Sequence, residues 1–269
     1  MNRVPLKFWL RFMAPHTNIL VTRPAGQAQA LCAAITAKGF SVHCLPMLQV
    51  LPLAKLAPRQ QQQVMDLDNY QHLIFVSANA VRFGMECIES CWPQLPVGLD
   101  WYAVGDGTAR LLLPFGVEAY TPGSAMSSEG LLALPQLQQM QGARVLIVKG
   151  EGGRQTLAEE LGRRGARVDE LACYRRAAPD LAPKELALKL VQWEIDLVMI
   201  SSGEGLCNML ALLSPAETTN FSRITLLVPS PRVADMAHAA GFEQVITAEN
   251  ASDSAMLRAL ATSQTSAGE

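Results

Sequence analysis

Short apolar runs along this chain are each followed by an amphipathic segment, a pattern that predicts alternating strands and helices. The clearest case begins with the apolar run Val145–Val148, which is followed by the glycine-rich segment Lys149–Arg154. Leu157 and Leu161, four residues apart among charged residues, predict a helix that ends at Gly165. This order places helix N-terminal amides at the carboxyl end of a strand, where open α/β sheets bind ligands and anions are favoured. A negatively charged ligand is one interpretation, and a tight glycine corner with no ligand is the other.

The same pattern occurs near the start of the chain. The run Ile19–Pro24 predicts a strand and a turn, and a helix that ends at Gly39 follows. Four positions of this segment recur 126 residues later (157 − 31 for the first). The matched pairs are Leu31 with Leu157, Ile35 with Leu161, Gly39 with Gly165 and Val42 with Val168.

Further segments of the two halves also match, at offsets of 124 (197 − 73) or 125 (241 − 116) residues. The pairs are Leu73–Ala78 with Leu197–Ser202, Val104–Gly105 with Val228–Pro229, Gly116–Glu118 with Gly241–Glu243, and Ser127–Ser128 with Ser252–Asp253. An internal duplication of about half the chain therefore predicts two similar α/β domains. The residues alone permit either a tandem or an interleaved order of the two domains.

Three segments are expected to connect the repeated elements. The extended run Phe40–Pro46 contains a proline, which favours an exposed linker strand over a central strand. The amphipathic segments Pro58–Asn69 and Pro183–Trp193 predict surface helices.

Composition narrows the class of protein. The chain has 269 residues, 49% of them hydrophobic, which is enough for one large or two modest cores. Its net charge of −2, without a block of like charges, predicts no nucleic-acid partner. The six cysteines lack CxxC or metal-type spacing, so we expect reduced thiols of a cytoplasmic protein. The four histidines are scattered, so we expect no metal site.

The two ends of the chain are expected to lie outside the fold. The apolar residues of Met1–Pro15 are interrupted by Lys7 and Arg11, and the run is too short for a membrane span or a signal peptide. We expect a disordered extension there, with a helix on a membrane surface as the less common alternative. We expect disorder in the tail, residues 263–269, as well.

Five motifs in a fixed order carry a resemblance to a known family. They are Val21–Pro24, Phe75–Val81, Ala103–Ala109, Lys149–Arg154 and Val168–Arg176. Each motif alone is unspecific, but their order and spacing between about Ile19 and Leu260 resemble the uroporphyrinogen-III synthase family.

The resemblance implies an α/β fold of two flavodoxin-like parallel-sheet domains, joined by a two-stranded β ladder, with the chain interleaved between them. Residues 17–43 and 180–262 would form the first domain, residues 54–168 the second, and residues 44–53 and 169–179 the linkers. Cys44 and Cys173 would then lie on neighbouring strands as free thiols. The substrate would bind in the cleft between the domains.

The resemblance also implies a reaction. Hydroxymethylbilane, a linear tetrapyrrole with eight carboxylates, would be cyclised to uroporphyrinogen III with loss of water and inversion of ring D through a spiro intermediate, in heme biosynthesis. Because this substrate also closes unaided to the wrong isomer, the main task is positioning, which can supply several kcal/mol. We expect a cytoplasmic monomer without a cofactor, whose partner is this small molecule and neither nucleic acid nor a membrane.

One side chain is expected to assist departure of the hydroxyl group as a general acid. Tyr174 is the candidate, since a phenol with an ordinary pKa of ~10 is protonated at neutral pH and can donate. A tyrosine that only packs across two strands is an equal alternative.

The substrate carboxylates are expected to be bound by helix N-termini, hydroxyl groups and a few cations. The candidates are Arg23, Ser77, Ala78, Gly105, Thr108, Gly150, Gly152, Arg154, Ser201, Ser202, Ser230 and Arg232. The serines are equally explained as helix caps. Thr108 is carried over from the family's Gly-x-x-Thr-Ala pattern, although a threonine that only satisfies a helix start is the commoner case. The second half departs from this pattern, so a surface arginine is the default interpretation of Arg232. Arg23 would bind a carboxylate or pair with an acidic neighbour.

Two other functions compete with this interpretation. A dinucleotide enzyme would need a glycine where Arg110 stands, and a phosphate-binding loop would need Gly-Lys-Ser/Thr, which is missing between Gly150 and Thr156. A non-catalytic two-domain binding protein for an anionic small molecule would use the same hinged cleft. Such a protein would bind a tetrapyrrole without changing the isomer that forms.

Overall fold

The computed structural model describes residues 17–265. The expected N-terminal extension, residues 1–15, lies outside the described residues, as do residues 266–269 of the expected tail. Residues 263–265 continue helix α12 (Asp253–Thr265), so the prediction of a disordered tail is wrong for these three positions.

The chain divides into two compact units. Within the described residues, unit 1 comprises residues 17–49 and 177–265, and unit 2 comprises residues 50–176. The chain therefore leaves unit 1 after one strand–helix–strand segment, forms all of unit 2, and returns to complete unit 1.

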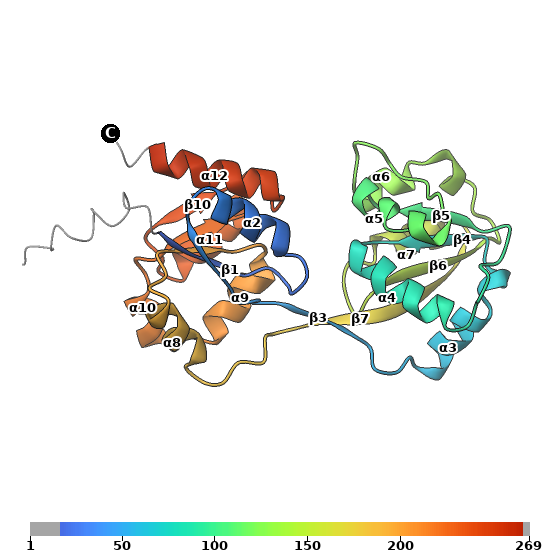
Figure 1. The fold of residues 1–269 in the computed structure, drawn as a ribbon. Helices are drawn as coiled ribbons and strands as arrows, with labels where there is room; N and C mark the ends of the chain where they lie inside the picture. The colour runs from blue at the N-terminus through green and yellow to red at the C-terminus, as the bar shows by residue number, and fades with distance from the viewer. Residues whose placement is uncertain (1–16, 266–269) are drawn as a thin grey trace, which may run out of the picture. The chain divides into compact units, whose positions relative to one another are not determined.

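Unit 1 is built on a parallel sheet with the strand order β10-β9-β8-β1-β2 (Figure 1). Its strands are β1 (Asn18–Val21), β2 (Ser41–Cys44), β8 (Leu197–Met199), β9 (Thr225–Val228) and β10 (Val245–Thr247). Its helices are α2 (Gln29–Ala37), α8 (Glu185–Gln192), α9 (Gly203–Ala211), α10 (Pro215–Asn220), α11 (Pro231–Ala239) and α12.

Helices cover both faces of this sheet, so its central strands are apolar on both sides (Figure 1). Successive residues of a strand point to opposite faces. Ile19 therefore packs with α2 and α12, whereas Leu20 packs with α8, α9 and α11. The predicted first helix is confirmed: Leu31 and Ile35 are buried.

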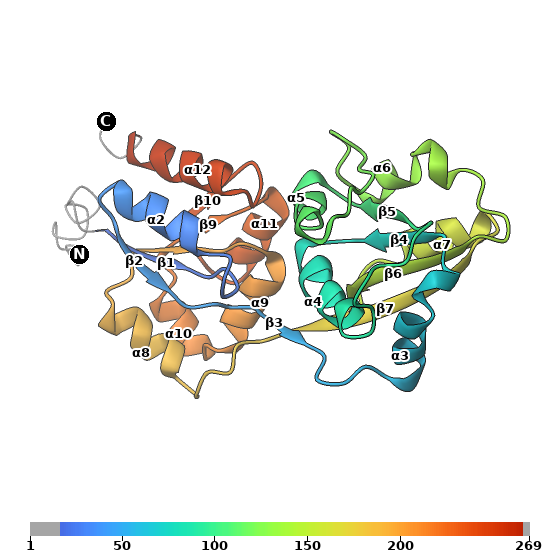
Figure 2. The ribbon, with the colours of Figure 1, turned by 45° about the vertical axis from the view of Figure 1, so that its right-hand side comes forward.

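Unit 2 has a second sheet, ordered β3-β7-β6-β4-β5. Its strands are β3 (Gln49–Pro52), β4 (His72–Phe75), β5 (Asp100–Ala103), β6 (Arg144–Gly150) and β7 (Arg167–Ala177). Its helices are α3 (Pro58–Met65), α4 (Ala78–Glu89), α5 (Asp106–Arg110), α6 (Ser128–Leu132) and α7 (Thr156–Arg163), with short 3-10 turns at Leu67–Asn69, Leu113–Phe115 and Pro135–Leu137. Strands β4 to β7 are parallel, and β3 lies beside β7 in both views (Figures 1 and 2).

The second sheet is also covered on both faces. Leu146 and Val148 of β6 pack with residues of α4, while Val145 and Ile147 pack with residues of α6 and α7. The predicted strand and helix of this segment are confirmed, and the chain turns at Gly165 with a φ of +91°. Only glycine adopts such a φ without strain.

The internal duplication is visible in the strand order. Four strands of each sheet have the same order when β1 is matched with β6, β2 with β7, β8 with β4 and β9 with β5. The register of the strands corrects the alignment of the middle segments. Ile19 of β1 pairs with Leu197, and the equivalent residue of β6, Val145, pairs with His72. The two partners are therefore offset by 125 residues (197 − 72) instead of 124. Ser77 therefore corresponds to Ser202, and both cap a helix.

One expectation for the connecting segments is partly wrong and a second is wrong. The run Phe40–Pro46 contains an edge strand, β2, and no central strand, as expected, but this strand belongs to the sheet of unit 1 and is not a linker. The proline of the run lies beyond the strand's last residue, Cys44. Cys44 pairs with Val21 of β1, whereas Cys173 lies on β7 of the other sheet, so these cysteines are not on neighbouring strands.

Candidate functional site

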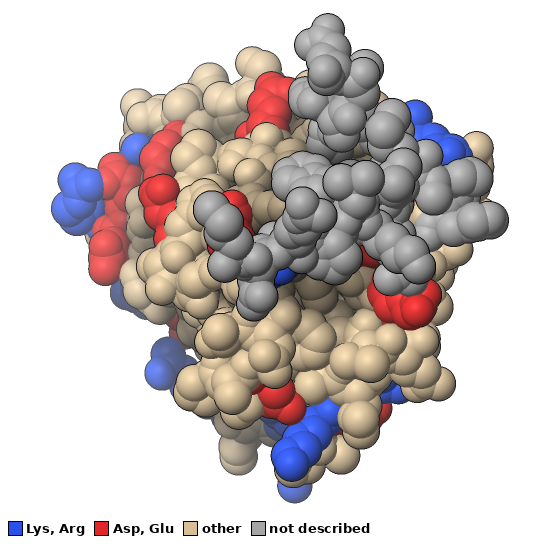
Figure 3. Space-filling view, turned by 90° about the vertical axis from the view of Figure 1, so that its left-hand side faces the viewer, with Lys and Arg blue, Asp and Glu red and all other residues tan. Residues whose placement is uncertain are grey.

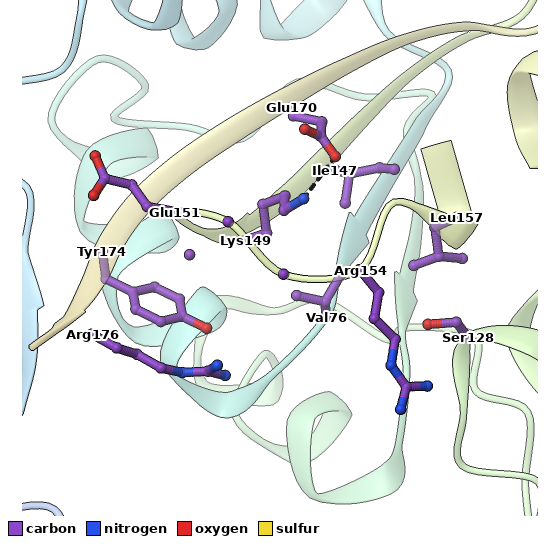
Figure 4. Close-up of a pocket in the computed structure, with 13 residues that line it drawn as sticks. Val76, Ser128, Ile147, Lys149, Glu151, Arg154, Leu157, Glu170, Tyr174 and Arg176 are labelled. Atoms are coloured by element: carbon purple, nitrogen blue, oxygen red, sulfur yellow. Dashed lines mark hydrogen bonds and ion pairs between the residues drawn. The ribbon is translucent and has the colours of Figure 1, made fainter. Parts of the chain in front are cut away.

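A cavity of about 250 Å³ opens in unit 2 at the carboxyl end of β6. Its wall combines the end of β6, the glycine-rich loop that leads to α7, the first turn of α7 and one side of β7 (Figure 4). The lining residues are Val76, Ser128, Ile147, Lys149, Gly150, Glu151, Gly152, Gly153, Arg154, Leu157, Glu170, Tyr174 and Arg176. This is the edge of a parallel sheet at which ligands of α/β proteins bind.

The loop in this wall depends on glycine. Gly152 and Gly153 have φ values of +70° and +85°, which side chains other than glycine adopt only with strain. Helix α7 then begins at Thr156, and the side chain of its N-cap residue, Gln155, makes no capping hydrogen bond. The backbone amides of this helix start therefore lie at the cavity without a side-chain cap from Gln155.

Charged side chains surround the cavity. Lys149, Arg154 and Arg176 supply three cations, and Glu151 and Glu170 supply two carboxylates, which leaves one positive charge in excess. Lys149 is buried and donates to Glu170 over 2.8 Å, so this pair neutralises itself (Figure 4). The local charge thus favours an anion, although the whole chain carries −2.

Tyr174 is buried, with 3% of its surface exposed, although the resemblance placed it within a linker, residues 169–179. Its ring is tilted against Phe83, and its hydroxyl lies 3.0 Å from the Oγ of Ser77. The phenol also lines the cavity next to Arg176 (Figure 4). Tyr174 is therefore a core residue of unit 2 that presents one edge to the cavity.

The remaining candidates of unit 2 lie at two helix starts. Ser77 caps α4 by accepting a hydrogen bond from the amide of Ala80, and Ala78 is the first residue of that helix. Gly105 is the N-cap residue of α5, and its carbonyl accepts from the amide of Thr108. The structure thus brings Ser77 to Tyr174, but it does not place Ala78, Gly105 or Thr108 in the cavity wall.

Four candidates lie at helix starts of unit 1. Ser202 caps α9 by accepting from the amide of Gly205, and Ser201 precedes it. Ser230 is the N-cap residue of α11 but makes no side-chain capping bond. Arg232, in the first turn of that helix, directs a guanidinium nitrogen to the sulfur of Met236, 3.7 Å away.

Arg23 has an acidic partner within unit 1. Its guanidinium forms an ion pair with Asp253, the first residue of α12, and also donates to the carbonyl of Ala251. The pairing that was expected as the alternative to carboxylate binding is therefore present. A ligand carboxylate at Arg23 would share this guanidinium with Asp253.

The sequence interpretation did not single out Arg176, Glu170 or Ser128 as site residues, yet all three line the cavity. A signal for Arg176 existed, because residues two apart on a strand share a face and Arg176 follows Tyr174 by two. No comparable signal marked Ser128, which approaches the cavity from a helix distant in sequence.

Residues 17–265 contain neither a cluster of metal-binding side chains nor a helix that could span a membrane. In this part of the chain, His, Cys, Asp and Glu side chains form no group of three or more that could hold a metal ion. None of its helices is long and apolar enough to cross a membrane. On the face of unit 1 shown in Figure 3, basic and acidic side chains are interspersed among uncharged ones.

These features define a class of protein: two doubly wound α/β units with one repeated strand order, one of them carrying a glycine-lined, cationic cavity. Comparison with known proteins gives the family. The family model described as uroporphyrinogen-III synthase HemD matches residues 29–258. The chain belongs to this family.

Relatives with assigned names agree. The chain is 33% identical to the uroporphyrinogen-III synthase of Escherichia coli K12, over 90% of this chain and 99% of that protein. It is 31% identical to the enzyme of the same name from Salmonella typhimurium LT2, with the same coverage. Among solved structures, a mutant uroporphyrinogen III synthase of Thermus thermophilus matches with a TM-score of 0.57 at 20% identity, over 91% of this chain and 99% of that one. The uroporphyrinogen-III synthetase of Helicobacter pylori 26695 matches with a TM-score of 0.56 at 14% identity, over 92% of this chain and 99% of that one. At these identities the two structures show the fold alone.

Proposed function

We propose that this chain is a cyclising lyase that converts hydroxymethylbilane to uroporphyrinogen III, with loss of water and inversion of ring D. The observation that carries this function is the 33% identity to a uroporphyrinogen-III synthase across nearly the full length of both proteins. The cationic cavity at the sheet edge of unit 2 agrees with a substrate that carries carboxylates.

The chemistry requires positioning more than a strong nucleophile. Hydroxymethylbilane closes unaided to the isomer with an unflipped terminal ring, so the enzyme must hold the chain such that the substituted carbon of ring D attacks. Orientation of reacting groups can supply several kcal/mol of a barrier. Helix starts and glycine amides are suited to this task, because they fix carboxylates without flexible side chains.

Tyr174 is the proposed proton donor to the departing hydroxyl group. Its phenol lines the cavity, and its hydroxyl has a second hydroxyl, that of Ser77, at 3.0 Å. Ser77 can accept from or donate to this phenol, so the pair provides a route for replacing the proton. Arg176, on the same side of β7, supplies positive charge beside the phenol (Figure 4).

The substrate carboxylates are proposed to meet groups of both units. Unit 2 would contribute Gly150, Gly152 and Arg154 from the loop before α7, together with the starts of α4 and α5. Unit 1 would contribute the starts of α9 and α11, with Arg23 and Arg232.

The deciding experiment supplies hydroxymethylbilane to the purified protein and separates the two ring-closed isomers by chromatography. We expect uroporphyrinogen III to dominate, while a control without protein gives the isomer with an unflipped ring. A protein that binds the tetrapyrrole but leaves the unflipped isomer dominant would be a binding module, and the proposed activity would be lost.

We further propose that the enzyme acts as a cytoplasmic monomer without a cofactor. All six cysteines are free thiols, which is typical of proteins from reducing compartments. Light scattering coupled to gel filtration checks the oligomeric state: the monomer mass is 29.1 kDa, and a dimer mass would contradict the proposal.

A further inference from the structure

Two cysteines of unit 1 lie side by side on adjacent elements. Cys32 belongs to α2, and Cys44 is the last residue of β2. Helix α2 connects β1 to β2, and Cys32 packs in the apolar cluster between the helix and the sheet. The two Sγ atoms are 2.8 Å apart.

The two thiols differ in exposure. Cys44 is exposed to solvent, whereas Cys32 is partly buried. The pKa of the Cys32 thiol is raised to about 12. Burial is the largest cause, the neighbouring Cys44 adds to the rise, and Arg23 acts in the opposite direction. Because Cys44 is the exposed thiol, an oxidant reacts with Cys44 first, and Cys32 is the neighbouring thiol that then reacts with the oxidised Cys44.

We propose that Cys32 and Cys44 are a reversible oxidation site that forms a disulfide when a hydroperoxide reacts with the protein. The Cys44 thiol attacks the peroxide oxygen, which yields a sulfenic acid at Cys44 and one alcohol or water molecule. The Cys32 sulfur then attacks the sulfenic sulfur, so that the S–S bond forms and a water molecule leaves with the Cys32 proton. Two thiols are oxidised by two electrons and one peroxide bond is reduced, and a dithiol reductant reverses the change.

The local structure accommodates this bond. A disulfide has a sulfur–sulfur distance of about 2.05 Å, so the two atoms need to approach by about 0.8 Å from 2.8 Å.

The position of the pair gives oxidation a consequence. A bond between Cys32 and Cys44 ties α2 to the end of β2, after which residues 45–48 lead to β3 of unit 2. It closes a loop between residues that are 12 apart, which restricts the unfolded chain and stabilises the fold. We therefore expect the oxidised protein to unfold at a temperature several degrees higher than the reduced protein.

The test uses the full-length protein and hydrogen peroxide. Reduced protein is oxidised, its remaining thiols are alkylated, and tryptic peptides are analysed by mass spectrometry without reduction. Lys38 lies between the two cysteines, so trypsin separates them unless a disulfide joins their peptides. We expect the joined peptide pair, lighter by two hydrogens than the separate thiols, and its loss after treatment with dithiothreitol.

Matched variants assign the bond. Cys44→Ser and Cys32→Ser should each abolish the joined peptides and the rise in unfolding temperature, while Cys207→Ser, at another exposed cysteine, should keep both. Conversion of Cys44 to sulfinic acid while Cys32 remains open to alkylation would overturn the inference, as would an unfolding temperature that oxidation leaves unchanged. The readout needs no tetrapyrrole, so it is independent of the proposed enzymatic function.

Discussion

The ring of Tyr174 occupies the space that a side chain at Gly150 would fill. A Cβ atom at Gly150 would lie 2.6 Å from a ring carbon of Tyr174, closer than real contacts allow. Both residues line the cavity of unit 2, so the glycine sets the position of the phenol as well as the path of the loop. The sequence interpretation assigned Gly150 to ligand binding, and the structure adds this packing role.

Gly150→Ala should therefore act through Tyr174. The added methyl group displaces the ring, which should lower the free energy of unfolding by about 1–3 kcal/mol, as overpacking does. Gly162→Ala, on α7, is the matched control, since a Cβ there meets nothing within 4 Å and alanine favours a helix by up to about 1 kcal/mol. Urea unfolding of both variants checks the pair, and equal stability of Gly150→Ala and the parent would contradict the packing role.

Tyr174→Phe separates chemistry from packing, because the ring stays and only the hydroxyl is lost. Loss of the contact to Ser77 should reduce stability by about 1 kcal/mol. If the phenol protonates the leaving hydroxyl group, turnover should fall by about 100-fold or more, with less uroporphyrinogen III among the products.

The control for this prediction is Tyr102→Phe, another buried tyrosine, whose hydroxyl lies 3.1 Å from Nδ1 of His72. It should lose comparable stability and keep its turnover. Unchanged turnover and isomer ratio in Tyr174→Phe would remove this residue from the mechanism and leave it a structural role.

At the scale of elements, Asp169 of β7 forms hydrogen bonds with side chains of α3. Its carboxylate accepts from Arg59 at 2.9 Å and Gln63 at 3.3 Å, both on α3, and from the hydroxyl of Tyr70 at 3.1 Å. Burial alone would raise the pKa of this carboxyl, but the three hydrogen bonds outweigh burial and lower it. The charged form is therefore the one that the fold stabilises.

The sign of the pH effect follows from that direction. A carboxyl whose pKa is lower in the folded protein stabilises it above the unfolded pKa of about 3.9, and the contribution is lost as pH falls through the folded value. Asp169→Asn should thus be less stable by about 1–3 kcal/mol at pH 7, with a smaller difference at pH 3. Urea midpoints at the two pH values test this, with the exposed Asp68→Asn as control; a difference that grows in acid would contradict it.

The elements that could be predicted from the sequence are those whose buried face is defined by apolar residues at regular spacing within the element itself. Leu157 and Leu161 suffice for α7, because both are buried on one face of it. β7 was expected to be partly linker because its length is a tertiary property. It pairs with β6 as far as Tyr174, lies beside β3 in the sheet, and continues to Ala177. Likewise, the pairing of Arg23 with Asp253 joins residues 230 apart, and only the fold brings them together.

At the scale of the whole molecule, each of the four apolar clusters belongs to a single unit. Unit 2 is one continuous segment, while unit 1 is assembled from two segments on either side of it. The duplicated sequence predicted two similar halves but left the interleaved order open, because pairing of β1 with β8 is a contact between segments 178 residues apart (197 − 19).

This organisation predicts that a fragment of residues 49–177, which contains all of β3 and β7, folds without unit 1. Both of its apolar clusters are complete, so circular dichroism should show mixed α/β structure and one cooperative thermal transition. With hydroxymethylbilane, however, the fragment should give no more uroporphyrinogen III than the control without protein. The reason is that Arg23, Ser202 and Ser230, which are proposed to hold part of the substrate, lie on unit 1. A folded fragment that inverts ring D alone would show that unit 2 contains the entire site, and the proposed sharing of the substrate between two units would be wrong.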